Sequence, residues 1–356
     1  MMKTQVKKID FSNQNIYCGV DVHKKRWQVT ICTEHMVQKS LSFERPFVDK
    51  LKHYLDKHYP GGNYYVAYEA GFSGFWPQKA LKAAGMEAIV VNPADIPTTD
   101  KERKHKNDKR DSRKLALSLR SGELRGIYIP DDTALQHRSM VRERWSIANS
   151  ERRVKNQIKC HLMFHGMEIP QEMDRSYWSR RFIGWLEQIQ KEHSDEALAF
   201  KINRLLILRQ LQVQATRSLR ELAGHERYVK TYRILRSVPG VGLLTAMLLL
   251  VEIIDIKRFP RFAELCSYVG FIPTSKSSGE QERYGEMTNR KNNRITSGLV
   301  QSSWSAIKSD PELLMKYEHY RKKMGAQKAI VRIAKILLRR IRMVWLTQTP
   351  YQKSEF

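Results

Sequence analysis

The first third of the chain alternates short apolar segments with turn residues in an order that few folds accommodate. Three strand-like segments, 16–22, 27–32 and 37–43, follow one another with only short polar connections, which predicts an antiparallel meander. Helix-like and strand-like segments then alternate, with helices expected at 46–59, 75–84 and 108–119 and strands at 64–68 and 88–91. This order indicates an RNase H-like α/β fold. We expect it to occupy residues 1–132.

The rest of the chain has the pattern of an all-α protein. Residues 133–235 contain little glycine and place leucines at helical spacing, which predicts long helices paired as an antiparallel coiled coil, acting as a spacer or oligomerisation arm. Residues 236–356 are expected to form a mostly helical C-terminal domain. It begins with a glycine-rich turn before an apolar helix, which is typical of a helix-hairpin-helix element. The backbone at Gly240 and Gly242 is a candidate phosphate-binding site, although an ordinary turn into a buried helix fits the same residues.

Net charge is the strongest indication of the partner. The 63 Lys and Arg residues exceed the 37 Asp and Glu residues and give a net charge of +26, which favours a polyanionic partner, nucleic acid before an anionic membrane. The longest apolar run, 241–254, is too short to cross a bilayer. The N-terminus lacks the apolar core of a secretory signal, and the four cysteines form no CxxC pair. We therefore expect no membrane, disulfide framework or structural zinc, and a reducing cytoplasm fits best.

Four carboxylates occur where the predicted fold would bring them together. Asp21 interrupts an apolar strand, Glu69 ends a second strand, and Asp108 and Asp111 are three positions apart on a predicted helix. In an RNase H-like sheet the first and fourth strands are neighbours, and a later helix packs over them. Clustered acids repel unless a cation lies between them, and hard oxygen ligands favour Mg²⁺ or Mn²⁺. Two such ions could support phosphodiester cleavage.

Each acid also has an ordinary interpretation when it is taken alone. Asp21 could pair with Lys24, and Asp108 could be the N-cap of its helix. The segment 101–114 surrounds the last two acids with cations that could contact DNA phosphates, or could simply be a solvated loop. We favour the contact role because the run flanks the proposed metal ligands. Its candidate residues are Lys106, Lys109, Arg110, Arg113 and Lys114.

Several strings resemble the DEDD transposases of the insertion-sequence-110 family, which mobilise bacterial insertion sequences. The N-terminal strings are GVDVHK at 19–24, YEA at 68–70 and NDKRDSRKLA at 107–116, and the last is the most specific. The C-terminal strings are VPGVG at 238–242 and YVGFIPTSKSSG at 268–279. The resemblance covers nearly the whole chain. One departure concerns the segment after SSG, where Lys291 stands in place of an expected second glycine.

The resemblance implies a RuvC-like N-terminal catalytic domain and a C-terminal domain with a nucleophilic serine. That serine maps to Ser278, with Ser277 as the alternative, and it would form a covalent phosphoserine link to DNA. The resemblance further implies double-stranded DNA at the element ends and target as substrate, and a guide RNA from the element. It also implies a homo-oligomer, a dimer or tetramer, that unites the two domain types across subunits in the bacterial cytoplasm and nucleoid.

Two other functions fit part of the same pattern. A two-metal nuclease that resolves branched DNA would use the four acids without the serine. A non-enzymatic nucleic-acid or ribonucleoprotein scaffold would use neither, and its acids would be purely structural. Variants of Asp21 and Ser278 would separate the three possibilities, because only the transposase needs both residues.

Overall fold

The computed structural model describes residues 10–97, 107–173, 178–278, 281–287 and 291–352. The chain forms two compact units, Met1–Ile129 and Pro130–Phe356. The first unit ends close to the boundary expected for the α/β domain. The further division of the second unit at residue 235 stays a prediction.

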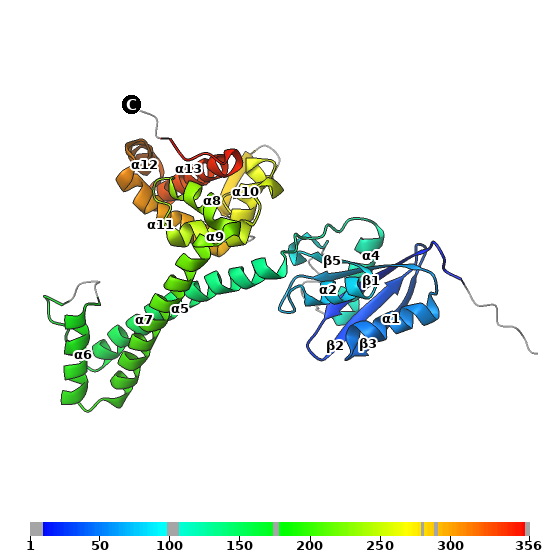
Figure 1. Ribbon diagram of the computed structural model, residues 1–356, viewed down its shortest axis with the longest axis horizontal. Coiled ribbons are helices and arrows are strands. Elements are labelled where there is room, and N and C mark those ends of the chain that lie inside the picture. The colour runs from blue at the N-terminus through cyan, green and yellow to red at the C-terminus, as the bar shows by residue number, and fades with distance from the viewer. Residues whose placement is uncertain (1–9, 98–106, 174–177, 279–280, 288–290, 353–356) are drawn as a thin grey trace, which may run out of the picture. The chain divides into compact units, whose positions relative to one another are not determined.

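A five-stranded sheet forms the centre of the first unit (Figure 1). β1 (Asn15–Val22), β2 (Arg26–Cys32) and β3 (Val37–Glu44) form an antiparallel meander. β4 (Asn63–Glu69) pairs with β1 in parallel, and β5 (Glu87–Val91) pairs with β4 in the same way. The strand order is β3-β2-β1-β4-β5. The mixed sheet fits the predicted RNase H-like fold, and β1 and β4 are neighbours as expected.

Helices cover both faces of this sheet. α1 (Phe47–His58) and α2 (Trp76–Ala83) pack on the face that carries the main apolar core of the unit. There the Trp27 ring stacks on Phe47, with centroids 4.9 Å apart. The short 3-10 helix η1 (Pro93–Asp95) follows β5. α4 (Asp108–Arg120) packs against β1, β2 and β4.

The contact between α4 and β1 depends on a glycine. A Cβ added at Gly19 would lie 2.1 Å from the Ser112 carbonyl oxygen and 2.3 Å from the Ala116 backbone nitrogen. A larger residue at this position would push the helix away from the sheet. The buried hydroxyls of Thr30 and Ser112 share a hydrogen bond of 2.9 Å across the same contact. Together they fix where along the sheet α4 begins.

Two long helices form one end of the second unit. α5 (Asp132–Phe164) and α7 (Glu196–Gly224) pack along each other, and α6 (Arg180–Glu192) packs against them (Figure 1). The end of α5 meets the start of α7 in a small apolar cluster that includes Leu162 and Leu198. The two helices are therefore antiparallel. The more specific expectation of coiled-coil packing stays a prediction.

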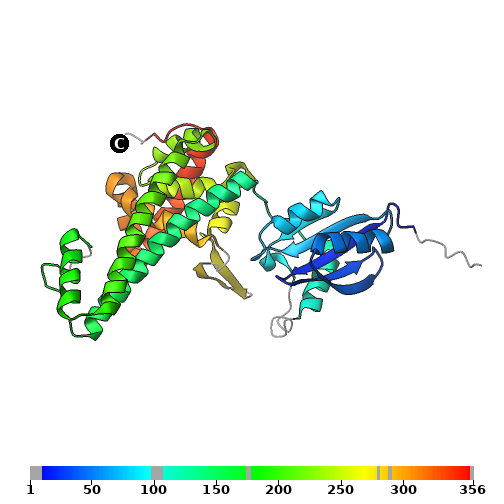
Figure 2. The same ribbon diagram turned by 60° about the horizontal axis from the view of Figure 1, so that its bottom comes forward.

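The remaining helices enclose a larger apolar core. Its centre is formed by the apolar helix α9 (Leu243–Ile253) and by α13 (Ala326–Thr347). The surrounding elements are α8 (Glu226–Arg236), η2 (Ile256–Arg258), α10 (Phe262–Val269), α11 (Asn293–Ser309) and α12 (Pro311–Met324). Between α10 and α11, β6 (Pro273–Ser278) and β7 (Gln281–Met287) form an antiparallel hairpin, which projects from the helices in Figure 2. Across the described ranges, no helix combines the length and apolar character needed to cross a membrane.

Candidate metal-binding carboxylate site

Asp21 lies at the end of β1, on the face of the sheet that α4 covers. Successive strand residues point to opposite faces, so Asp21 shares a face with Gly19, which touches α4. The Asp21 side chain is 21% exposed. An acid in such a partly buried position needs a polar or cationic partner.

That partner is a histidine which also reaches the second acid of the site. His23 Nε2 lies 3.1 Å from Asp21 Oδ2 and 3.4 Å from Asp108 Oδ2. Asp108 Oδ2 also accepts a hydrogen bond of 3.1 Å from the Arg26 guanidinium. Asp21, His23 and Asp108 each offer a ligand atom within 4.8 Å of the others. Two acids that are distant in the sequence therefore meet at the end of the sheet.

The start of α4 fixes the position of Asp108. The helix is capped by Asn107, whose side-chain oxygen accepts a hydrogen bond of 3.0 Å from Lys109 N. Asp108 is thus the first helical residue and not the N-cap, and its side chain is directed to His23 and Arg26. The side chain of Asp21 likewise contacts His23 rather than Lys24. Both acids thus contact His23, and their role as metal ligands stays a prediction.

Glu69 and Asp111 lie next to this group without belonging to its tightest part. Val20 pairs with Tyr68, so Asp21 and Glu69 occupy the next positions of two neighbouring strands. Asp111 is one helical turn beyond Asp108. Of the four acids expected from the sequence, the close group of described ligands contains Asp21 and Asp108, with His23 as its third member.

The electrostatic environments of the two central acids differ. Burial raises the pKa of Asp21, and the negative charges of Asp108 and Asp111 raise it further, while His23 opposes them. For Asp108, partial burial acts to raise the pKa. The Arg26 hydrogen bond and His23 together outweigh it and hold that pKa below its ordinary range. Asp21 is the acid with the least compensated charge, and a bound cation would relieve it.

Sequence reasoning missed His23 and Arg26. Both lie between the first two predicted strands, 16–22 and 27–32, where we expected a short polar connection. A signal for His23 was present, because residues 21 and 23 are two apart and an extended strand would place them on one face. The meeting of Arg26 with Asp108 depends on the packing of α4 and has no local signal.

Most of the expected cationic residues lie on the first turns of α4. Lys109, Arg110 and Arg113 are exposed and Lys114 is partly buried. Lys106 lies outside the described residues. The exposed cations are available to an anionic ligand beside the acids, and their contact with DNA stays a prediction.

The two glycines of the expected phosphate-binding turn have different surroundings. Gly240 has a φ of +82°, and an added Cβ would lie 2.4 Å from the Ser302 carbonyl oxygen of α11. Close packing therefore explains why this position needs glycine. Gly242 caps α9, and an added Cβ there would meet nothing within 4 Å. A phosphate site at this turn, and its assignment as a helix-hairpin-helix element, stay predictions.

The two candidate serines lie at the end of one strand of the hairpin. Ser278 is the last residue of β6 and pairs with Gln281, and Ser277 pairs with Glu282. The hairpin belongs to the second compact unit, whereas the carboxylates belong to the first.

Comparisons with known protein families match both units. A model of DEDD transposases of the IS110 type matches residues 18–166. A model described as "Transposase IS116/IS110/IS902 family" matches residues 232–318. The first match contains the carboxylate cluster, and the second contains the hairpin with both serines.

Individual relatives agree with these family matches. The chain is 29% identical to the Sinorhizobium fredii protein y4qE, which carries the name of a transposase, over 68% of this chain and 58% of that protein. The chain thus spans little more than half the length of that relative. It is 27% identical to the transposase for insertion sequence element IS1533 of Leptospira borgpetersenii, over 78% of this chain and 80% of that protein. A shorter match, 36% identical over 29% of this chain and 25% of the relative, is to a 43.6 kDa protein of insertion element IS110 in Streptomyces coelicolor.

Proposed function

Because the chain belongs to the IS110 family of DEDD transposases, we propose that it cuts and rejoins double-stranded DNA at the ends and target of a bacterial insertion sequence. The observation that carries this proposal is the meeting of Asp21 and Asp108 at His23 Nε2, at 3.1 and 3.4 Å. Membership of the family implies divalent-metal chemistry, and this cluster is where such chemistry fits.

The donor set suits a hard divalent cation. We propose that Asp21 and Asp108 are ligands, with Glu69 and Asp111 completing the set from the adjacent strand and the next helical turn. Carboxylate oxygens favour Mg²⁺, and the His23 imidazole is also compatible with Mn²⁺. When bound, such ions stabilise the attacking and leaving oxygens of a phosphodiester displacement.

The residues around the cluster have separate roles in this proposal. Arg26 neutralises Asp108 in the absence of the cation, and His23 separates the two carboxylates. The exposed side chains of Lys109, Arg110 and Arg113 would hold phosphates of the scissile strand, with Lys106 and Lys114 extending this basic segment. Charge-assisted contacts of this kind fix the position of the backbone but carry no sequence information.

Ser278 is the proposed nucleophile, and Ser277 is the alternative. The serine hydroxyl oxygen would form a bond to phosphorus while the bond from phosphorus to one sugar oxygen breaks. The hydroxyl proton would pass to a base, and the released sugar oxygen would take a proton from water and leave as a hydroxyl. A serine hydroxyl is a weak nucleophile, so it needs such activation. The finer features of the proposal are a guide RNA from the element, a homodimer or homotetramer, and a location at the nucleoid in the bacterial cytoplasm.

Trapping the covalent intermediate tests this function. The full chain is incubated with the DNA of the element ends, RNA transcribed from its flanks and Mg²⁺, and adducts are mapped by mass spectrometry. We expect a Ser278 adduct in the unchanged protein, its loss in Ser278→Ala, and its retention in Ser277→Ala. Asp21→Ala is expected to lower DNA cleavage at least about a hundredfold, since a metal centre contributes several kcal/mol to such a reaction.

Either of two outcomes would contradict the proposal and identify a different function. Divalent-dependent cleavage that survives both serine substitutions, without any adduct, would identify a two-metal nuclease. DNA or RNA binding with no cleavage, unaffected by Asp21→Ala, would identify a scaffold. Asp49→Ala is the matched control, because Asp49 is an exposed acid of the same unit on α1.

A further inference from the structure

The two ends of the serine-bearing hairpin are joined to each other where they leave the helices. The backbone N–H of Asn292, just before α11, donates a hydrogen bond of 3.1 Å to the Tyr268 carbonyl of α10. The Thr296 hydroxyl donates one of 2.5 Å to the Val269 carbonyl. A Cβ added at Gly270 would lie 2.2 Å from Lys291 Cβ. The base of the hairpin is therefore tightly closed.

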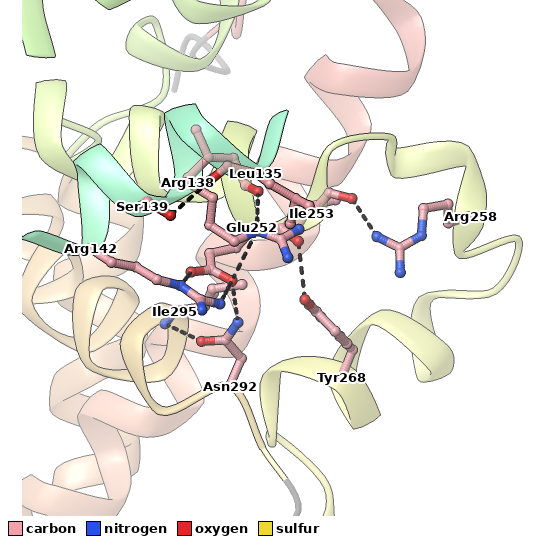
Figure 3. Close-up of polar contacts among 11 residues, drawn as sticks. Leu135, Arg138, Ser139, Arg142, Glu252, Ile253, Arg258, Tyr268, Asn292 and Ile295 are labelled. Atoms are coloured by element: carbon pink, nitrogen blue, oxygen red, sulfur yellow. Dashed lines mark hydrogen bonds and ion pairs between the residues drawn. The ribbon is translucent and has the colours of Figure 1, made fainter. Parts of the chain in front are cut away.

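Both ends also contact one buried acid, Glu252 of α9. The Tyr268 hydroxyl donates a hydrogen bond of 3.0 Å to the Glu252 carbonyl. Asn292 Nδ2 donates one of 3.1 Å to Glu252 Oε2. Figure 3 shows Tyr268 and Asn292 converging on this residue. Glu252 is thus a shared anchor for α10, which precedes the hairpin, and for Asn292, which caps α11 after it.

Two arginines of α5 hold Glu252 in place. Arg142 donates to both carboxylate oxygens, Nε to Oε1 at 2.7 Å and Nη2 to Oε2 at 2.8 Å. Arg138 Nε lies 3.9 Å from Oε2 and donates to the Val251 carbonyl at 2.9 Å. The paired geometry fixes the orientation of the carboxylate, because a guanidinium matches both oxygens at once.

The burial of Glu252 makes this arrangement costly to break. Its side chain is 1% exposed, and burial acts to raise its pKa. The Arg142 hydrogen bonds and charge outweigh that effect and hold the pKa below its ordinary range. Removing one partner of such a group leaves an uncompensated charge in the core. A buried ion pair adds little stability compared with well-packed apolar residues, so its presence needs another explanation.

We propose that Glu252 is a positioning residue that fixes the β6–β7 hairpin, and with it Ser277 and Ser278, on helix α5. The inference rests on the proposed function, because the hairpin matters for catalysis only if one of these serines reacts. The Glu252 carboxylate would act through Asn292, while the Glu252 backbone carbonyl holds Tyr268, and neither group would touch the DNA. The chain itself links this anchor to the carboxylate unit, because α5 begins directly after that unit ends.

Amide hydrogen exchange in the hairpin tests the anchor independently of any chemistry. The test variants are Glu252→Gln and Asn292→Asp, the second of which keeps a side-chain oxygen to cap α11. The matched control is Asp310→Asn, which alters a buried acid of the same unit that is paired with Arg340 at 2.6 Å. We expect the hairpin amides to exchange about tenfold faster in both test variants, relative to α6, because a hydrogen bond to a charged group is lost. In the control we expect no such selective change.

A double variant separates positioning from stability. Arg142→Met combined with Glu252→Met replaces the buried ion pair by apolar side chains, which can restore stability. We expect its melting temperature to recover while fast hairpin exchange remains and adduct formation stays about a hundredfold slow, the size of effect that a small misplacement of a reacting group can produce. The proposal is overturned if hairpin exchange and adduct formation in the double variant return to the rates of the unchanged protein together with its stability. It is also overturned if the hairpin exchanges equally fast in Glu252→Gln and Asp310→Asn. If the unchanged protein forms no serine adduct, the proposed function fails while the exchange result still decides the role of Glu252.

Discussion

Asp21 and Glu252 are both carboxylates placed in apolar elements, and their surroundings are opposite. Asp21 is the second-last residue of β1 and lies beside two other acids, whose like charges add to burial in raising its pKa. Glu252 lies within α9 beside two arginines, which hold its pKa down despite deeper burial. The Asp21 cluster thus carries negative charge that its own unit compensates only in part. The negative charge of Glu252 is compensated by the two arginines beside it.

The difference separates a binding site from a structural anchor. Acids that face one another gain stability when a cation enters, so their arrangement favours ligand binding over stability of the free protein. An acid whose carboxylate oxygens already accept hydrogen bonds from guanidinium groups has no oxygen free to coordinate an ion. Its hydrogen bonds instead hold together the elements that meet there. Burial alone would have ranked Glu252 as the better candidate for a functional acid, but the charges of the neighbours reverse that ranking.

The largest expected effect on stability is at Glu252. Glu252→Ala should lower the free energy of unfolding by about 3 kcal/mol, the lower end of the cost of breaking a buried pair. We choose the lower end because Arg142 remains 40% exposed and can be solvated. Chemical denaturation measures this loss in the free energy of unfolding, and amide hydrogen exchange in α9 and α11 locates it. A loss below about 0.5 kcal/mol is typical of surface substitutions, and it would contradict the role of Glu252 as a structural anchor.

Acid should remove the same contribution without any mutation. The pKa of Glu252 in the folded protein lies below its ordinary value of 4.5, so its stabilising effect is complete above that value. It is lost as the pH falls through the folded pKa, because the proton then displaces the Arg142 hydrogen bonds. The stability difference between the unchanged protein and Glu252→Gln should therefore be constant near neutral pH and shrink below pH 4.5. A difference that grows on acidification would contradict the lowered pKa.

The sequence predicted the sheet and the place of Asp21 better than the role of Glu252. β1 and β2 have apolar residues in short runs bounded by polar turns, and their predicted limits differ from the structure by one residue. The strand order then implied that Asp21 and Glu69 lie on adjacent strands, which the register supports. A recognisable topology therefore predicts which distant acids lie on neighbouring strands.

Contacts between distant residues that do not follow from the strand order could not be predicted in this way. In the sequence Glu252 only interrupts an apolar run, and nothing indicates that Arg142, 110 positions away, reaches it. Arg26 is a similar case, because its hydrogen bond to Asp108 depends on the packing of α4. Gly240 shows the converse, since a glycine that suggested phosphate binding is also required by its contact with α11.

A smaller effect should come from a divalent cation in the first unit. A ligand that binds only the folded state stabilises it by about 1.4 kcal/mol when its free concentration is tenfold above its dissociation constant. Titration of Mg²⁺ or Mn²⁺ should therefore raise the melting temperature of the first unit, and Asp108→Asn should abolish the rise. Glu252→Gln is the control, because its cluster offers no free coordination. A rise that persists in Asp108→Asn would place the cation elsewhere.

The smallest expected effect is a stabilisation, whereas Glu252→Ala is expected to destabilise the protein. With cations removed by a chelator, Asp21→Asn should slightly raise the melting temperature of the first unit at neutral pH. With Mg²⁺ present, the same variant should lose DNA cleavage. The amide keeps the shape of the side chain and a hydrogen-bond partner for His23, but it removes a charge that burial, Asp108 and Asp111 all disfavour. Since the folded pKa is raised, the ionised aspartate is least favourable above that pKa, and the advantage of Asn should vanish as the pH falls below the ordinary aspartate range. Asp56→Asn is the matched control, because Asp56 is an exposed acid paired with Lys52 at 2.6 Å. Destabilisation of the unit by Asp21→Asn would mean that Asp21, like Glu252, stabilises the fold, and the distinction between the two acids would be lost.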